Sequence, residues 1–414
     1  MSSPALVMAH RARSARSRSP RVAVTAVFVV HGLLFASWTA HIPHVMRHLG
    51  LTDGTLGIAL LGAPVGSVAA MMLASYLIPK LGSRRVVQFA LVGYCATGPL
   101  VGLTGSLAAL FGALFIWGAF QGTLDVAMNT QAIAVERAGR RPLMSGLHGS
   151  WSIGSFAGAG IGALAVGAGL SLTPQLLILG TIALLGAGLL TSRMLPDAIE
   201  RPGADERPKT GTRSASRWSG GMILLGAIAF AGMLCEGASA DWASVYLSGP
   251  LHATGAVPGL GYAAFALAMV TVRLSGNRLL RRFRPSRLLP VLAAVATVGF
   301  AAGLAIGRPA AAIAGFVFLG IGLASVVPAV FSAAGRIPGL HAGKAVATVA
   351  ACGWAGFVCG PPLIGHLASV ASLSMALGLL PFLTAFVAVG TLASRALRYV
   401  PLGPASPARS DGTP

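Results

Sequence analysis

Charged residues are scarce in this chain. Only 10% of its 414 residues are charged, and Asp and Glu together number ten. A soluble domain usually carries about 25% charged residues. The composition is instead 55% hydrophobic, with a mean hydropathy of +0.78. This balance excludes a soluble globular protein and predicts a chain that crosses a lipid bilayer several times.

Cysteine is also scarce, and the motifs of common cofactors are missing. The four cysteines lie in apolar segments without a CxxC pair or a companion histidine, so we expect packing residues and no metal site. The sequence has no GxxxxGK[ST] loop, which excludes ATP binding of the P-loop kind. We expect no cofactor, no catalytic residue and no enzymatic activity.

Long apolar runs, by contrast, are abundant. Twelve of them approach the roughly 20 residues that a helix needs to cross a bilayer. They cover residues 22–44, 55–79, 86–105, 107–134, 142–169, 174–195, 219–248, 257–276, 286–306, 309–334, 342–368 and 372–396. A lone spanning segment satisfies its backbone hydrogen bonds only as a helix, and the alternating pattern of a barrel is missing. We therefore predict an all-α membrane protein with twelve transmembrane helices.

The two halves of the sequence repeat each other at an offset of 202 residues. Lys80 then aligns with Arg282, and three glycines align in later runs: Gly118 with Gly320, Gly154 with Gly356 and Gly158 with Gly360. Duplicated six-helix halves are a common transporter plan, with the substrate site between them. We predict a basic tail at 1–21, a six-helix bundle at 22–195, a linker at 196–218, a second bundle at 219–396 and a tail at 397–414.

Basic residues predict the orientation in the membrane. The chain has 30 Lys and Arg, which cluster in the tail and in loops that all lie on one side if the helices alternate. Only Arg47 and Arg308 fall in loops on the other side. The positive-inside rule then places both termini and the linker in the cytoplasm. Because the charges are scattered over many short loops, they indicate topology rather than a nucleic-acid partner.

Acids inside the apolar runs are the leading functional candidates, because a charge in the bilayer is costly unless it faces a cavity or a partner. Gln121, Asp125 and Asn129 recur at i, i+4 and i+8 and predict one polar wall of a cavity. Glu236 and Asp241 are five residues apart, about 140° around a helix, so they should not both face that cavity. Asp241, nearer the outer end, is the stronger candidate for a structural contact. A hydrogen bond within the bundle is the alternative role for Asp125.

Histidines and tryptophans share helical faces in two runs. His31 lies on a face with Phe35 and Trp38, and His148 lies on a face with Trp151. Aromatic rings beside hydrogen-bonding groups suit a neutral polar solute such as a sugar. A histidine, with an unperturbed pKa of about 6.5, also suits proton transfer. A satisfied polar residue between packed helices is an equally good interpretation of each histidine.

Several motifs resemble those of the major facilitator superfamily. The loops after the second and eighth runs carry the basic part of its signature, but both copies lack the signature's acid. The residues concerned are Lys80, Gly82, Arg84 and Arg85, and in the second copy Arg281 and Arg282. The resemblance implies that these loops take part in switching between inward-open and outward-open states. The stretches LDVAMNTQAIAVE at 124–136, SGLHGSWSIG at 145–154 and EGASADW at 236–242 are similar to a bacterial inner-membrane branch related to the fucose/proton symporters.

The resemblance and the polar faces together predict a secondary active transporter that moves a small polar, sugar-like solute by alternating access. Proton symport is the leading mechanism, since Asp125 matches the helix 4 acid that handles protons in the fucose symporter. Efflux of drugs or metabolites by proton antiport, and a transport-inactive membrane sensor, are the alternatives. We expect the substrate, protons and the lipid bilayer as partners, a monomeric state, and a place in the bacterial cytoplasmic (inner) membrane.

Overall fold

The chain folds into helices that cross the membrane twelve times. The computed structural model describes residues 4–139, 143–196, 220–282, 285–337, 340 and 342–398. In these ranges no strand occurs, and twelve helical segments are long and apolar enough to span a bilayer. The twelve predicted spans and the all-α class are therefore confirmed.

The first six spans form the N-terminal half. Its elements are α1 (Pro4–Ser37), η1 (Thr39–His41), α2 (Ile42–His48), α3 (Asp53–Leu60), α4 (Gly62–Leu81), α5 (Ser83–Thr97), η2 (Gly98–Leu103), α6 (Leu107–Gly139), α7 (Met144–Gly167), α8 (Leu172–Ala183), η3 (Leu184–Gly188) and η4 (Thr191–Arg193). Short breaks divide several spans, as Leu61 does between α3 and α4. Gly82, at a φ of +84°, separates the second span from the third. The backbone of the predicted basic tail is helical from Pro4 and continues into the first span.

The last six spans form the C-terminal half. Its elements are α9 (Gly220–Ser248), α10 (Val257–Arg282), α11 (Pro285–Ile306), α12 (Pro309–Leu323), α13 (Val326–Ala334), α14 (Ala342–Val370), α15 (Leu373–Leu377), α16 (Leu379–Ala393) and α17 (Arg395–Arg398). The predicted linker at 196–218 and the predicted tail at 397–414 lie outside the described residues, apart from position 196 and positions 397–398. Those two boundaries stay predictions.

The packing inside each half repeats, as the sequence does. A Cβ on Gly118 of α6 would overlap the carbonyl oxygen of Ala63, and a Cβ on Gly320 of α12 would overlap that of Phe265. Ala63 and Phe265 are themselves 202 residues apart. Small residues allow helix backbones to approach closely in a membrane. The sequence offset therefore corresponds to an equivalent helix contact in each half.

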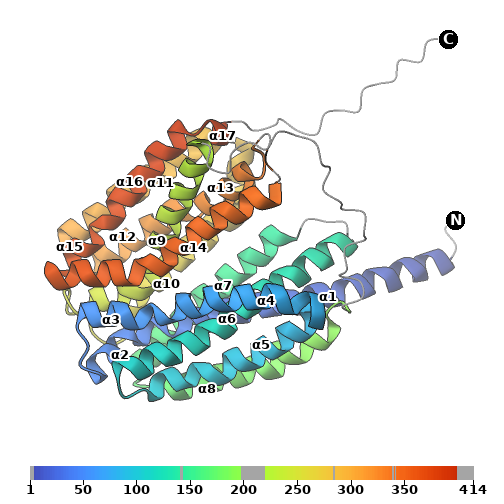
Figure 1. Cartoon of the computed structure of the whole chain (residues 1–414), viewed down its shortest axis with the longest axis horizontal. Helices are drawn as coiled ribbons and strands as arrows, with labels where there is room; N and C mark the ends of the chain where they lie inside the picture. Colours follow the sequence, from blue (N-terminus) through green and yellow to red (C-terminus); the bar gives the residue numbers. More distant parts are fainter. Residues whose placement is uncertain are drawn as a thin grey trace, which may run out of the picture.

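The halves meet at one end of the molecule and separate at the other. In Figure 1 the N-terminal helices (blue to green) lie below the C-terminal helices (yellow-green to red), and they converge at the left, where α3 adjoins α14. We call this the far end. There a Cβ on Gly57 would lie 2.5 Å from the carbonyl oxygen of Pro361, and Ser244 Oγ donates a hydrogen bond of 2.6 Å to the carbonyl of Thr39. The opposite end, where α4 and α6 finish near Lys80 and Arg137, we call the basic end.

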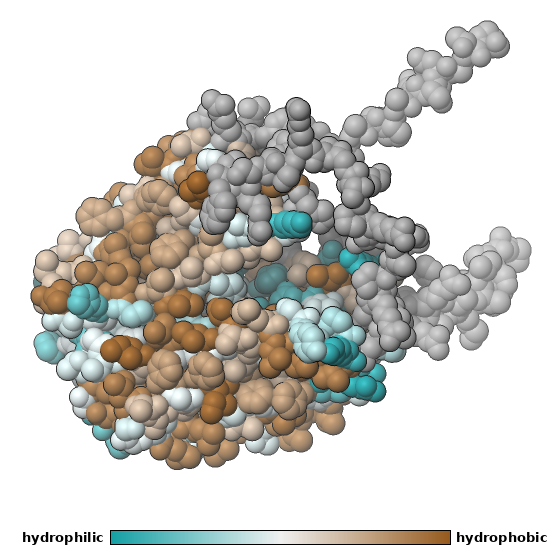
Figure 2. All heavy atoms as spheres, viewed as in Figure 1, coloured by the Kyte–Doolittle hydropathy of each residue, from teal (hydrophilic) through white to brown (hydrophobic). Residues whose placement is uncertain are grey.

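The outer surface is apolar, as a lipid-facing surface should be. Met72, Leu164 and Phe382 are 75%, 71% and 75% exposed. Figure 2 shows brown, hydrophobic residues over the described part of both halves and a hollow between the halves toward the basic end, with hydrophilic residues inside it. Large exposed apolar side chains cover a membrane protein without cost because lipid replaces water around them. The polar hollow is the place to look for a transport site.

Candidate functional site

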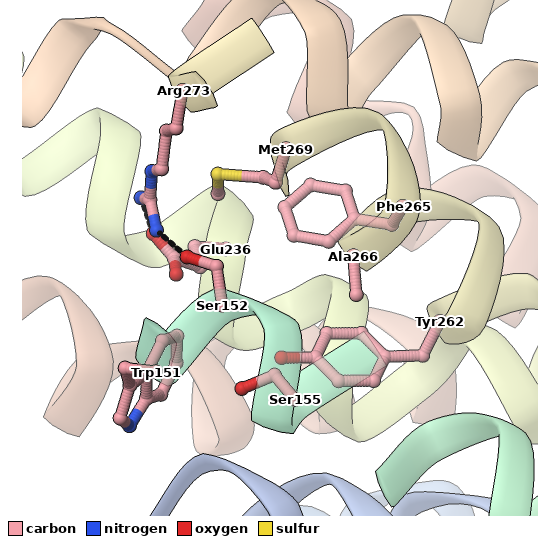
Figure 3. Close-up of a pocket in the computed structure, with 9 residues that line it drawn as sticks. All are labelled: Trp151, Ser152, Ser155, Glu236, Tyr262, Phe265, Ala266, Met269 and Arg273. Atoms are coloured by element: carbon pink, nitrogen blue, oxygen red, sulfur yellow. Dashed lines mark hydrogen bonds and ion pairs between the residues drawn. The ribbon is translucent and has the colours of Figure 1, made fainter. Parts of the chain in front are cut away.

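A small pocket lies between the two halves, about midway along the helices. It is lined from α7 by Trp151, Ser152 and Ser155, and from α9 and α10 by Glu236, Tyr262, Phe265, Ala266, Met269 and Arg273 (Figure 3). Its free volume of about 10 Å³ is room for one water molecule. The described conformation is therefore closed around this point, and a solute would need the walls to move apart.

Arg273 is the residue that joins the pocket's walls. Its Nη1 donates to Ser152 Oγ at 2.8 Å, its Nε donates to the carbonyl of Ala324 at 3.2 Å, and its Nη2 lies 3.9 Å from Glu236 Oε2. The side chains of Arg273 and Glu236 are only 19% and 15% exposed. Ser152 belongs to the N-terminal half and the other partners to the C-terminal half, so this one guanidinium bridges the two.

Sequence reasoning missed Arg273, because it treated every basic residue as part of a loop or a tail. A signal was present in the helical phase. Tyr262, Ala266, Met269 and Arg273 follow one another at spacings of three or four residues, which is one face of a helix. Arg273 therefore continues a face that begins deep in the apolar run, and α10 carries it into the pocket.

Trp151 connects the pocket to His31 on α1. Its indole Nε1 donates to His31 Nδ1 at 2.8 Å, and His31 Nε2 lies 3.3 Å from the carbonyl oxygen of Gln121. A neutral imidazole with its proton on Nε2 satisfies both contacts, since Nδ1 must accept and Nε2 must donate. Close packing of α7 on α1 makes this possible, because a Cβ on Gly154 would overlap the carbonyl of Val29. In this arrangement His31 is 4% exposed and satisfied between helices.

The polar stripe predicted on the fourth span is present on α6, but it does not line the pocket. Asn129 Nδ2 donates to the carbonyl of Asp125 at 2.8 Å and lies 3.3 Å from its Oδ1. Both side chains are half-buried. Gln121 joins the group through its carbonyl contact with His31. Among the described residues, the one link between this stripe and the pocket is therefore the backbone of Gln121, which meets His31 on the side away from Trp151.

The remaining predicted site residues occupy different surroundings. Glu236 lines the pocket, whereas Asp241 is half-buried five residues nearer the far end and is not among the lining residues. His148 is exposed and sits edge-on to Phe28, with ring centroids 5.6 Å apart. Trp38 is 4% exposed and packs at right angles to Trp117 in the core of the N-terminal half. That placement argues against contact between Trp38 and a solute in this conformation. Phe35, by contrast, contacts two lining residues, because it stacks on Trp151 and lies edge-on to Tyr262.

The predicted switch loops lie at the basic end. Lys80 Nζ sits 3.7 Å from the centre of the Tyr76 ring, at the end of α4. Gly82 forms the turn, and Arg84 and Arg85 open α5. In the second copy the structure describes the backbone of Arg281 and Arg282 at the end of α10, but not their side chains.

A larger cavity of about 350 Å³ lies at the far end within the N-terminal half. Residues of α2, η2 and the α7–α8 connection line it, His44 and His48 among them. His41, which also lines this cavity, is buried and contacts Gln175 Oε1 through Nε2 at 2.8 Å. All residues that line the 350 Å³ cavity come from the N-terminal half, so this cavity does not lie on a path between the two halves.

Comparison with known sequences identifies the family. The sequence model of the Major Facilitator Superfamily matches residues 23–336 of this chain. An uncharacterised MFS-type transporter of Yersinia pestis is 35% identical over 376 residues, which cover 91% of this chain and 96% of that protein. The membrane protein MosC of Rhizobium meliloti is 32% identical over 362 residues, covering 86% of each chain.

Comparison with solved structures gives the same fold. A mutant form of the nucleoside transporter NupG superposes with a TM-score of 0.71 at 12% identity, over 91% of this chain and 99% of that one. A bacterial homologue of the lysosomal transporter Spinster superposes with a TM-score of 0.65 at 15% identity, over 92% and 98%. At these identities the likeness concerns the fold alone. From the family match and the two sequence relatives, this chain belongs to the major facilitator superfamily of membrane transporters.

Proposed function

We propose that the protein is a proton-coupled symporter that moves a small polar solute by alternating access. The observation that carries this proposal is the Arg273–Glu236 ion pair, which lies between the two halves and bonds to Ser152 of the opposite half. An acidic and a basic side chain at the contact between two halves that move against each other can couple protonation to that movement. Protonating Glu236 would remove the negative charge that faces Arg273.

Asp125 is the second acid in this proposal. It lies half-buried on α6, the helix whose Gln121 carbonyl meets His31, and Asn129 is its hydrogen-bond partner. Ionisable groups inside transmembrane segments commonly mark ion or substrate pathways. We therefore assign proton handling to Asp125 and Glu236, and solute contact to Trp151 and Arg273.

The proposed orientation follows from the basic loops. The basic end faces the cytoplasm of a bacterium and the far end faces outward, with both termini inside, because Lys and Arg concentrate in cytoplasmic loops. The hollow toward the basic end would then be an inward-facing vestibule. Lys80, Arg84 and Arg85, with Arg281 and Arg282, would lie at its rim and take part in the switch.

Proteoliposomes loaded with a pH-sensitive dye test this proposal. A transported solute should carry protons inward with it, and Asp125→Asn should abolish uphill accumulation while leaving solute exchange intact. Asp53→Asn, at the start of α3 at the far end, is the matched control and should behave like the parent. Proton release in place of uptake when the solute enters would contradict symport and favour antiport, and uphill transport by Asp125→Asn would remove Asp125 from the mechanism.

A further inference from the structure

Arg273 has hydrogen-bonding capacity that its neighbours do not use. A guanidinium offers five N–H donors. Within the described residues, Nε and Nη1 each make one hydrogen bond, while the 3.9 Å from Nη2 to Glu236 exceeds hydrogen-bond length. The two-pronged geometry that guanidinium and carboxylate adopt when they bind tightly is therefore unfilled. Glu236 balances the charge of Arg273 without occupying its fork.

We infer that the transported solute is a small organic monoanion whose carboxylate binds the fork of Arg273 while Glu236 takes up a proton. This inference rests on the proposed symport and specifies its substrate. Guanidinium is the group best shaped to hold a carboxylate by two parallel hydrogen bonds. The carboxylate of the solute would replace the loose charge partner that Glu236 now provides.

Charge balance explains why proton and anion would travel together. The pocket holds one fixed positive charge and one negative charge, so the empty site is neutral. A protonated Glu236 with an anion on Arg273 is again neutral, whereas either partner alone leaves one unbalanced charge in a membrane interior, which costs several kcal/mol. A neutral solute arriving with a proton would leave Arg273 unbalanced. The arrangement therefore favours a monoanion over a neutral or cationic solute.

The charged and titratable groups around Glu236 are few, so this balance is not obscured. Tyr262 and Arg273 face it from α10, and Cys235, Asp241 and Tyr246 lie on its own helix. His148 on α7 lies within electrostatic range of Arg273. The other helices packed on α9 contribute little. Three of them, α12, α13 and α16, contain no charged residue. The titratable groups of α14 are Lys344 and His366 near its two ends and two cysteines, Cys352 and Cys359, and those of η1 and α2 lie at the far end: His41, His44, Arg47 and His48.

The rest of the pocket indicates what body the anion has. Ser155 is 2% exposed, and its hydroxyl has no hydrogen-bond partner in the described part of the chain although it lines the pocket. In Figure 3 the hydroxyls of Ser155 and Tyr262 point toward the same space beside Trp151. An unpartnered buried hydroxyl is costly, and a solute hydroxyl would satisfy it. The solute class that fits is a hydroxylated monocarboxylate such as a sugar acid, which keeps the hydroxyl-rich body that the aromatic residues suggested.

The test uses the full-length protein and pairs of probes that differ in charge. D-gluconate and L-lactate are compared with their neutral counterparts, sorbitol and propane-1,2-diol, by thermal shift and then by uptake into proteoliposomes. We expect a carboxylate to bind at least tenfold more tightly than its neutral counterpart, and more tightly at pH 5.5 than at pH 8. Glu236→Gln, which mimics the protonated acid, should bind it equally at both pH values and should lose uphill accumulation.

Variants at Arg273 separate charge from shape. Arg273→Gln should lose carboxylate binding, and Arg273→Lys, which keeps the charge but not the fork, should weaken it by tenfold or more. Arg47→Gln, at an exposed position of α2, is the matched control and should bind normally. Two outcomes would overturn the inference and leave the proposed symport intact. One is binding or accumulation of a neutral or cationic probe alone, unaffected by Arg273→Gln. The other is failure of every carboxylate to bind. A protein that binds a probe but moves none would instead overturn the proposed function.

Discussion

The hydrogen bond between Trp151 and His31 gives a prediction about stability that the structure can quantify. Trp151→Phe keeps an aromatic ring against Phe35 but removes the indole N–H that His31 Nδ1 accepts at 2.8 Å. His31 is 4% exposed, so water cannot replace the donor freely. Leaving a buried acceptor unsatisfied costs about 1–3 kcal/mol, a factor of about 5 to 150 in the unfolding equilibrium.

A second tryptophan supplies the control for the smaller ring. Trp354 packs against Phe357 with ring centroids 5.6 Å apart, and its indole makes no hydrogen bond within the described residues. Trp354→Phe therefore removes the same atoms without the polar contact. We expect Trp151→Phe to lower the free energy of unfolding, measured in mixed micelles of mild detergent and SDS, by about 1–3 kcal/mol more than Trp354→Phe.

A double-mutant cycle then isolates the contact. In a His31→Phe background no acceptor is left, so adding Trp151→Phe should cost no more than the control substitution. Nitrogen-15 NMR of labelled histidine should also find His31 neutral with its proton on Nε2 in the parent protein. Equal stability of the Trp151→Phe and Trp354→Phe proteins, or a charged His31 at neutral pH, would refute the reasoning and return His31 to the candidates for proton transfer.

Three further predictions concern packing, a helix connection and topology. Gly118→Ala and Gly320→Ala should each destabilise the protein by about 1–3 kcal/mol in the same unfolding assay, because the added methyl group meets a backbone carbonyl. Gly112→Ala is the control and should not destabilise the protein, because nothing lies within 4 Å of the added methyl group. Equal effects at the three sites would contradict this packing. Glu136 Oε2 accepts from the backbone N–H groups of Leu143 and Met144, at 2.6 and 3.0 Å. Glu136→Ala should therefore lower stability by about 1–3 kcal/mol while Glu136→Gln retains most of it, and identical melting of the two variants would argue against these bonds. A cysteine introduced between positions 197 and 219 should be labelled only from the cytoplasm. Labelling of this cysteine in intact cells by an impermeant reagent would contradict the predicted topology.

The fold was predictable because a membrane imposes it. A run of about 20 apolar residues has one stable way to cross the bilayer, so counting such runs is nearly equivalent to counting helices. The 202-residue offset was also informative, since Gly118 and Gly320, and likewise Gly154 and Gly356, allow close approach in both halves. The third pair differs: a Cβ on Gly158 would overlap the carbonyl oxygen of Leu33, whereas the nearest atom to one on Gly360 is 3.8 Å away. Short breaks such as the one between α3 and α4 were not predicted, because hydropathy does not change across them.

The site was only partly predictable. Periodicity correctly grouped Asp125 with Asn129, because residues four apart on one helix must be neighbours. The contact of Glu236 with Arg273 depends on how α9 and α10 rotate against each other, which no single-helix pattern specifies. Trp38 illustrates the same limit: its phase in the first span was compatible with a cavity, but the tertiary packing turns it toward Trp117.

Alternating access requires the far end to close, and a bulky residue at the contact between the halves should prevent this closure. Gly57 lies against the Pro361 carbonyl, and a Cβ on Gly259 would lie 2.7 Å from the Cβ of Ala163. These contacts join the two halves, so a tryptophan at Gly57 cannot be accommodated unless the halves part at this end. Gly57→Trp should therefore shift the population toward states open at the far end.

Chemical labelling measures that shift directly. Ser244, which bonds to the carbonyl of Thr39 across the halves, is 2% exposed in the closed arrangement. In a protein whose native cysteines are replaced, Ser244→Cys should react slowly with a maleimide. Adding Gly57→Trp should make it react at least tenfold faster and should abolish solute accumulation, while Gly112→Trp, where nothing lies within 4 Å, should change neither. If Ser244→Cys stayed protected in a folded Gly57→Trp protein, the contact between α3 and α14 would not be the closure that alternating access requires.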